Sequence, residues 1–310
     1  MIYTVTLNPA VDYLVYLDRL TCGEIQRSTS EAFYFSGQGI NVSKVLKTLG
    51  MPALALGFLS GFTGRAIADA MREEEIPADF CMLPPSCGNT RINVKLRHGA
   101  ETDVNCTGPV IPETELSALT EKLLSLQKGD VVILSGSVPA SLGKTVYADL
   151  LLLLSDKDVL TVVDADGDLL MHALPHRPFL VKPNDEELVR VTGMPCDSDD
   201  EVLLAAEELQ KRGARNVLVS LGSRGALLVT EDKAAYRMGV AEGKLYNSIG
   251  AGDSMLAGFL AGYLQSGGDF ASALRLGTAT GGATAFSEGL CTKEMVDALL
   301  SALPRPTKIR

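Results

Sequence analysis

The feature that most constrains the fold is an alternation of short apolar runs with longer helical patterns, which begins near residue 110. Residues 131–134 (Val-Val-Ile-Leu) and 217–219 (Val-Leu-Val) are typical of strands buried on both faces of a sheet. Between such runs, leucines recur at helical spacing, as in the segment from Pro112 to Gly129. Repeated strand, helix, strand units predict an α/β fold: a doubly wound, mostly parallel sheet sandwiched by helices.

The first third of the chain has a different pattern. Residues 12–36 and 90–106 contain short strands of mixed polarity with flanking glycines, which suits a small antiparallel β lid beside the main sheet. Because the two lid segments are separate in the sequence, we expect residues 1–310 to form one domain with a discontinuous lid. Apolar positions on the lid, such as Tyr13 and Leu17, predict a homodimer contact through it.

Composition excludes several classes of function. Lys and Arg number 28 against 38 Asp and Glu, a net charge of −10, so nucleic-acid binding is disfavoured and an anionic ligand needs local donors. We find neither a membrane-spanning segment nor a secretory signal, and we expect a cytoplasmic protein without membrane contact. The six cysteines form no CxxC pair, and the three histidines lack metal-ligand spacing with them, which argues against zinc.

Three glycine-rich segments give weak signals for phosphate binding. Residues 136–145 end in Gly-Lys-Thr, but a P-loop needs a glycine at Val138, and Pro139 removes a backbone donor. Residues 37–42 match only half of a dinucleotide-binding fingerprint, which disfavours a dehydrogenase. Residues 220–225 directly follow a predicted strand, and open α/β folds bind ligands at that end of a strand.

The fourth segment is the most informative. Residues 250–253 (Gly-Ala-Gly-Asp) precede an apolar helix, so the amides of Gly250 and Gly252 lie at a helix N-terminus. Unpaired amides and the positive end of the helix dipole bind anions there. Asp253 falls in the first helical turn, where a carboxylate ordinarily caps the helix. Beside a bound phosphate, the same carboxylate can take the proton of an attacking hydroxyl.

Taken together, these motifs resemble those of the ribokinase-like (PfkB-type) carbohydrate kinases over nearly the whole chain. The matching motifs, in chain order, are residues 6–12 (TLNPAVD), 36–42 (SGQGINV), 182–187 (KPNDEE) and 250–254 (GAGDS). The first of them, together with residues 136–139, is similar to the branch that acts on phosphorylated ketohexoses. The resemblance implies ATP-dependent phosphorylation of a ketohexose phosphate, with fructose 1-phosphate as the leading substrate and tagatose 6-phosphate as the alternative.

The resemblance also implies roles for individual residues. Asp253 would be the catalytic base, and the amides of Gly250, Ala251 and Gly252 would form the anion hole. Asn184 and Glu187 would organise Mg²⁺, although both also suit an ordinary helix start. The residues implied to bind the sugar phosphate are Asp12, Gly37, Gln38, Gly39, Asn41, Arg27, Arg91 and Ser137. Those implied to bind ATP are Lys182, Asn184, Ser220, Gly222 and Gly225.

One position departs from the family pattern. Gln38 stands where the family commonly has lysine, so a cation near the reacting phosphate is replaced by a neutral amide. Either the magnesium ion or another basic side chain would have to supply that charge. A non-catalytic sugar- or nucleotide-binding regulator remains an alternative, because it would keep the same cradle but would not need Asp253 as a base.

Overall fold

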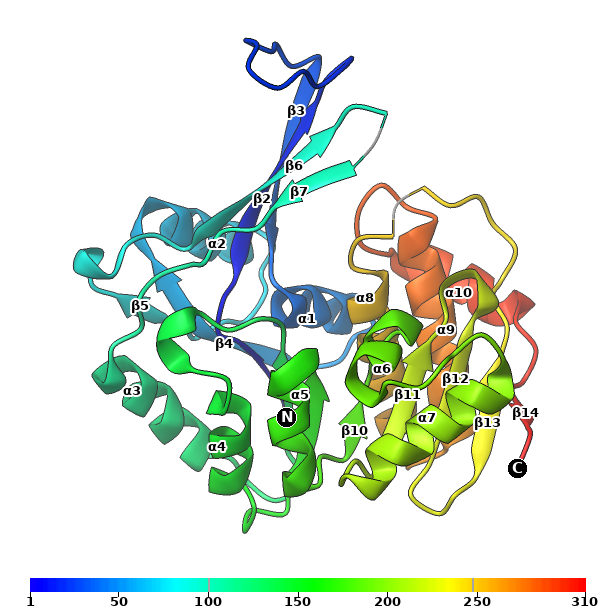
Figure 1. Cartoon of the computed structure of the whole chain (residues 1–310). Coiled ribbons are helices and arrows are strands. Elements are labelled where there is room, and N and C mark those ends of the chain that lie inside the picture. Colours follow the sequence, from blue (N-terminus) through cyan, green and yellow to red (C-terminus); the bar gives the residue numbers. More distant parts are fainter. Residues whose placement is uncertain (100, 247) are drawn as a thin grey trace.

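The computed structural model describes residues 1–99, 101–246 and 248–310. A ten-stranded sheet with helices on both faces forms the body, and a four-stranded lid projects from it (Figure 1). The strands from β5 to β11 are parallel, and those from β11 to β14 pair antiparallel, which confirms the predicted fold class. Across the sheet the strands are β14 (Thr307–Lys308), β13 (Ala235–Met238), β12 (Ala226–Val229), β11 (Asn216–Ser220), β10 (Leu180–Val181), β9 (Leu160–Asp164), β8 (Val131–Ser135), β1 (Ile2–Thr6), β4 (Ala53–Ser60) and β5 (Cys81–Leu83).

The central strands send alternate side chains into two apolar cores. On β8, Val132 and Leu134 belong to the core on one face of the sheet, and Val131 and Ile133 belong to the core on the other. All four are fully or almost fully buried. Because helices cover both faces, the strand contains no polar position between its ends, which is why residues 131–134 form an uninterrupted apolar run.

Two groups of helices cover the sheet. Helices α3 to α7 contribute to one core, α1 and α8 to α10 contribute to the other, and α2 packs with the base of the lid. The helices are α1 (Gln38–Thr48), α2 (Gly61–Glu73), α3 (Glu113–Leu124), α4 (Val146–Leu153), α5 (Gly167–Ala173), α6 (Asp185–Thr192), α7 (Asp199–Lys211), α8 (Ala251–Gln265), α9 (Phe270–Ala285) and α10 (Lys293–Ala302). None of the helices described combines the length and apolar character that a bilayer span requires.

Glycines let α8 and α9 approach closely. A Cβ atom at Gly258 would lie 2.4 Å from Oγ1 of Thr280, and one at Gly277 would lie 2.9 Å from the carbonyl oxygen of Met255. Larger residues at either position would push the two helices apart. This close packing fixes the axis of α8 and therefore the position of its N-terminus.

The lid is a mixed sheet whose strands are, in order, β3 (Ser30–Ser36), β2 (Ala10–Tyr16), β6 (Arg91–Arg97) and β7 (Glu101–Val104). The two outer pairings are antiparallel, whereas β2 and β6 run parallel with Ala10 opposite Arg91. The parallel pairing arises because both strands leave the body at their N-terminal ends. Residue 100, inside the expected lid range, lies outside the described residues.

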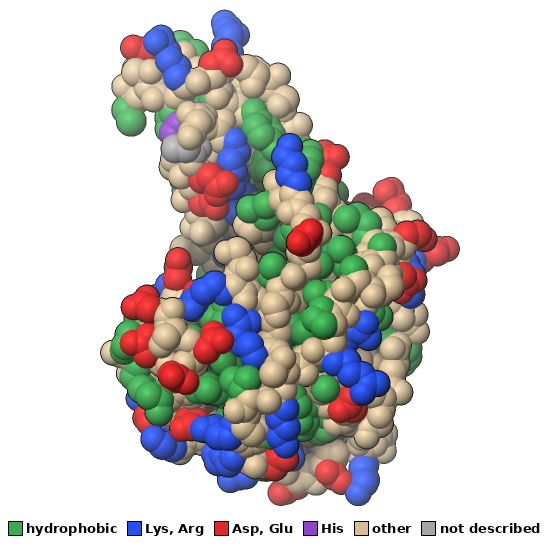
Figure 2. Space-filling view, turned by 90° about the vertical axis from the view of Figure 1, so that its right-hand side faces the viewer, with side chains coloured by type: hydrophobic (Ala, Val, Ile, Leu, Met, Phe, Trp, Pro, Cys, Tyr) green, Lys and Arg blue, Asp and Glu red, His purple; other side chains and the backbone are tan. Residues whose placement is uncertain are grey.

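One expectation about the lid is wrong. Arg27, which falls in the range 12–36 where we expect lid strands and which is expected there as a phosphate ligand, is exposed in the loop that joins β2 to β3. That loop contains a turn at residues 22–24 around Gly23, so the chain cannot continue the strand to Arg27. The lid stands clear of the body in the space-filling view (Figure 2). On it, Phe33 is 59% exposed and stacks against Tyr13 with ring centroids 4.4 Å apart.

Candidate active site

The N-terminus of α8 holds the buried carboxylate of Asp253. The helix follows Gly250, whose φ of 78° lies in the left-handed region that favours glycine. Asp253 is only 7% exposed, and its Oδ2 accepts a hydrogen bond of 2.7 Å from Nδ2 of Asn41. Within the described residues, its carboxylate caps no backbone N–H of the helix. The predicted alternative, an ordinary helix cap, therefore does not describe this side chain.

Burial sets the proton affinity of Asp253. Loss of water raises the pKa of this carboxyl to about 7, and the nearby carboxylate of Asp164 acts in the same direction. The hydrogen bond from Asn41 and the charge of Lys182 oppose this rise. A carboxyl group that titrates near neutral pH suits general base catalysis, because it accepts a proton strongly and is still ionised in a large fraction of molecules.

A buried ion pair lies beneath the first turn of α8. Lys182, just after β10, places Nζ 3.2 Å from Oδ1 of Asp164, and both side chains are less than one-tenth exposed. The same Nζ lies 3.2 Å from the position that a Cβ at Gly252 would take. Burial disfavours the charge of Lys182, but the surrounding carboxylates of Asp164, Asp253 and Glu187 raise its pKa. Lys182 is therefore a fixed cation beside the predicted anion hole.

Sequence reasoning missed Asp164. The residue is the last of β9, at the carboxyl end of a parallel strand, and its Oδ2 has no hydrogen-bond partner among the described residues. Its place at the end of an apolar run was the available signal, because ligands in open α/β folds bind at the carboxyl ends of the strands.

Two glycines allow the N-terminus of α1 to lie close to Asp253. A Cβ at Gly39 would lie 2.5 Å from Oγ1 of Thr6, and one at Gly37 would lie 2.8 Å from Cγ2 of Thr6. Both glycines thus allow the start of α1 to pack on the end of β1. The bond from Asn41 to Asp253 then joins α1 to α8, so two helix N-termini converge, and each favours a bound anion.

Arg91, Gln38 and Ser137 meet in a small cavity. It has a volume of about 250 Å³ and is lined by Thr6, Asn8, Gln38, Arg91, Asn105, Gly136 and Ser137. Among these lining residues, Arg91 is the one cation. Its Nε is buried without a partner in the described part of the chain, and burial lowers the pKa of its guanidinium. A buried, unpartnered donor is costly, so this cavity suits an anion that would pair with it.

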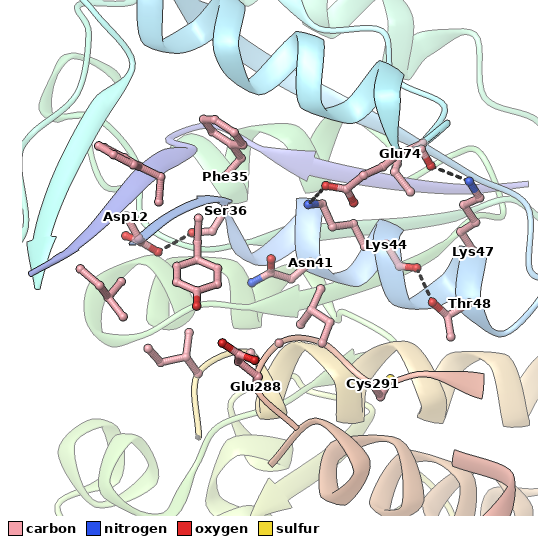
Figure 3. A pocket seen from close by; sticks show the side chains of 18 residues that line it. Asp12, Phe35, Ser36, Asn41, Lys44, Lys47, Thr48, Glu74, Glu288 and Cys291 are labelled. Atoms are coloured by element: carbon pink, nitrogen blue, oxygen red, sulfur yellow. Dashed lines mark hydrogen bonds and ion pairs between the residues drawn. The ribbon is translucent and has the colours of Figure 1, made fainter. Parts of the chain in front are cut away.

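Asp12 lies at the base of the lid in a second, larger cavity. This cavity of about 640 Å³ is also lined by Gly250. Asp12 and Asn41 line it together (Figure 3). Oδ2 of Asp12 accepts a hydrogen bond of 2.6 Å from Ser36, and Oδ1 accepts one of 2.8 Å from Asn93. Neither Ser36 nor Asn93 was singled out as a site residue from the sequence. Arg27 is not among the described residues that line either cavity.

Asn184 and Glu187 form a capping box at the start of α6. Oδ1 of Asn184 accepts a hydrogen bond of 2.7 Å from the Glu187 amide, and the Asn184 amide donates one of 2.9 Å to Oε2 of Glu187. The ordinary helix-start role is therefore present. Within the described residues, only Oε2 of Glu187 accepts a hydrogen bond, and burial raises the pKa of this carboxyl. One carboxylate oxygen fits Mg²⁺, a hard cation that keeps most of its ligands as water and substrate phosphates.

The segment after β11 lies beside this capping box. The amide of Ser220 donates to the carbonyl of Pro183, and Ser220 forms an isolated parallel bridge with Asn184. Gly222 begins a short 3₁₀ turn, and Gly225 has a φ of 94° with no room for a Cβ atom. Two segments that are predicted to bind ATP thus lie side by side at the carboxyl edge of the sheet.

Comparison with known proteins identifies the family. The model of the pfkB family of carbohydrate kinases matches residues 5–296. This chain belongs to that family. It is 44% identical over 300 residues to a 1-phosphofructokinase of Bacillus subtilis, with 97% of each chain covered. It is 34% identical over 304 residues to a D-tagatose-1-phosphate kinase of Bacillus licheniformis, with 98% of each covered.

A solved structure agrees with this assignment. Phosphofructokinase-2 from Escherichia coli, in complex with fructose-6-phosphate, superposes with a TM-score of 0.87 at 27% identity. The match covers 97% of this kinase and 98% of that chain. The expectation of a ribokinase-like carbohydrate kinase is confirmed, and the dehydrogenase alternative is excluded.

Proposed function

We propose that this kinase transfers the γ-phosphoryl group of ATP to the C6 hydroxyl of a ketohexose 1-phosphate, with fructose 1-phosphate as its preferred substrate. The observation that carries the proposal is that Gln38 and Asn41, one turn apart on α1, line two different cavities. One cavity offers a phosphate Nε of Arg91, which has no partner among the described residues, and the other is lined by Gly250, at the start of the helix that carries Asp253. The names of two relatives, both kinases of 1-phosphates, favour this orientation of the sugar.

The chemistry follows from these positions. Arg91 and Ser137 hold the phosphate of the sugar, and Asp12, Asn41 and the α1 glycines hold its ring hydroxyls. Asp253 takes the proton of the C6 hydroxyl as its oxygen attacks the γ-phosphorus. The new O–P bond forms, the bond from the γ-phosphorus to the bridging oxygen breaks, and ADP leaves with that oxygen. The amides of residues 250–252 and the charge of Lys182 stabilise the negative charge that develops.

The ATP side of the site is made by Lys182, Asn184, Ser220, Gly222 and Gly225. Asn184 and Glu187 would hold Mg²⁺, largely through water, beside the nucleotide phosphates. When bound, the ion neutralises part of the phosphate charge. Because Gln38 is neutral, other side chains must supply positive charge. We assign Arg91 to the phosphate of the sugar and Lys182 to the phosphoryl group that is transferred.

An assay of ADP release against a panel of sugars tests the proposal. The panel contains fructose 1-phosphate, tagatose 1-phosphate, fructose 6-phosphate, tagatose 6-phosphate, fructose and ribose. We expect the highest kcat/KM with fructose 1-phosphate. A preference for either 6-phosphate would contradict the proposed 1-phosphate substrate. Equal activity on free fructose would show that Arg91 does not bind a sugar phosphate. No transfer to any sugar would favour the non-catalytic regulator.

We also propose that the kinase forms a homodimer through the lid. The stacked pair of Tyr13 and Phe33, with Phe33 more than half exposed, supports an apolar contact with a second copy. Sedimentation at micromolar concentration should give the mass of a dimer, and Phe33→Asp should shift it to the monomer. A monomeric wild-type protein would refute this contact.

A further inference from the structure

Asn93 has an orientation fixed by its partner. It is the third residue of β6 and pairs with Asp12 in the parallel register of the lid. Its Nδ2 donates a hydrogen bond of 2.8 Å to Oδ1 of Asp12. Because an ionised carboxylate can only accept, the amide nitrogen must face Asp12, and the amide oxygen must face elsewhere.

The amide oxygen of Asn93 is a buried acceptor without a donor. The residue is 6% exposed, and its Oδ1 has no hydrogen-bond partner among the described residues. Buried polar atoms in folded proteins are nearly always paired, so an exception in a binding region calls for a ligand that supplies the missing donor.

The neighbours of Asn93 indicate which ligand that is. Arg91 and Asn93 are two residues apart on β6, so their side chains leave the same face of the strand. Arg91 lines the smaller cavity, and Asp12, the hydrogen-bond partner of Asn93, lines the larger one. Asn93 is not itself a lining residue of either cavity, but it adjoins one residue of each. Each oxygen of Asp12 already has one donor and keeps further lone-pair capacity. Asp12 and Asn93 together therefore present several hydrogen-bond acceptors. A ligand with adjacent hydroxyl groups would supply the matching donors.

We propose that Asn93 contacts the substrate directly: its Oδ1 accepts a hydrogen bond from the C3 or C4 hydroxyl of the ketohexose phosphate. Asn93 and Asp12 together then select the configuration of the ring hydroxyls. This inference rests on the proposed function and adds a specificity-determining residue to it. The competing explanation is that Asn93 acts only by holding Asp12 in place.

Asn93→Leu tests the contact, because leucine has a similar size and removes the acceptor. The measurement is kcat/KM for fructose 1-phosphate and for its C3 epimer, its C4 epimer, and the 3-deoxy and 4-deoxy analogues. In the wild type, we expect loss or inversion of the contacted hydroxyl to lower kcat/KM about 10- to 100-fold. In Asn93→Leu, fructose 1-phosphate should lose activity by a similar factor, and the preference over the altered sugars should largely disappear.

Ser36→Ala is the matched control, because it removes the donor to the other oxygen of Asp12. It should lower kcat/KM for all these sugars by one common factor and leave the preference intact. If Asn93→Leu also keeps the wild-type preference, Asn93 only positions Asp12 and the inference is wrong. Asn93→Ser gives the same comparison if the leucine variant does not fold. A wild-type enzyme that phosphorylates no ketohexose phosphate would instead refute the proposed function itself.

Discussion

The body and the lid differ in how they hold their functional groups. Asp253 and Lys182 are at least nine-tenths buried, on elements packed into the main core, and an ion pair and a hydrogen bond fix them. Arg91, Asp12 and Asn93 lie on lid strands β2 and β6, near the ends of these strands that join the body, and most residues farther out on β6 are only partly buried. The groups that we assign to phosphoryl transfer thus all lie in the packed body, whereas those that we assign to the sugar come from both the body and the lid. Each prediction below changes one side of this comparison.

The largest effect is expected from the body. Asp253→Asn should lower kcat by roughly 10²–10⁴-fold, because the general base is lost, and it should leave ATP affinity nearly unchanged. Single-turnover kinetics and ATP binding by calorimetry would check this. A rate near that of the wild type would show that Asp253 is not the base.

The largest effect on the lid side is expected at Arg91. Arg91→Ala should lower kcat/KM for fructose 1-phosphate about 10- to 100-fold, because a charged hydrogen-bond donor to the phosphate is lost. The KM for ATP should change little. Arg97→Ala, farther out on β6 and ion-paired with Asp103, is the matched control and should behave as the wild type. A defect confined to ATP in Arg91→Ala would contradict the phosphate contact.

A smaller effect is expected at Glu187, which we propose as part of the Mg²⁺ site in the body. Glu187→Gln should raise the Mg²⁺ concentration for half-maximal rate a few-fold, because the carboxylate charge near the ion is lost. Glutamine can keep the capping box, so α6 should stay folded. Glu201→Gln changes the equivalent capping box of α7 and should leave the Mg²⁺ dependence unchanged. An identical Mg²⁺ dependence in both variants would leave Glu187 with a structural role only.

The smallest effect concerns stability. The folded-state pKa of Asp253, about 7, lies above the value of an exposed aspartate, so the unfolded state loses its proton first as pH rises. Wild-type stability should therefore fall, relative to Asp253→Asn, between about pH 4 and pH 7 and then level off. Thermal unfolding should show Asp253→Asn melting several degrees higher at pH 8 and near the wild-type Tm at pH 4. Equal Tm values at pH 8 would mean that burial does not penalise this carboxylate.

The sequence carries clearer signals for the body than for the lid, and the roles of the site residues remain predictions. Residues 131–134 and 250–253 carry their signal locally, as an apolar run and as glycines before a helix. Asn93 carries none, because it is a single polar residue within a strand, and Asp164 carries only the weak signal of a polar residue at the end of an apolar run. Asn93 becomes informative only when β6 pairs with β2, which brings it to a residue 81 positions away. Asn184 and Glu187 present a different difficulty. Their pattern is easily seen in the sequence, but the same two residue types fit both a helix start and a metal site.

The bond between Asn41 and Asp253 spans 212 residues of sequence. During synthesis, which proceeds from the N-terminus, lid strands β2, β3 and β6 and the whole of α1 leave the ribosome long before α8 exists. The growing chain can therefore build parallel strands and even the lid, but it lacks the proposed base and the proposed anion hole until more than four-fifths of the protein has been made. This one hydrogen bond therefore joins a helix that is made early to one that is made late, and α9, α10 and β14 must still be added before the fold is complete.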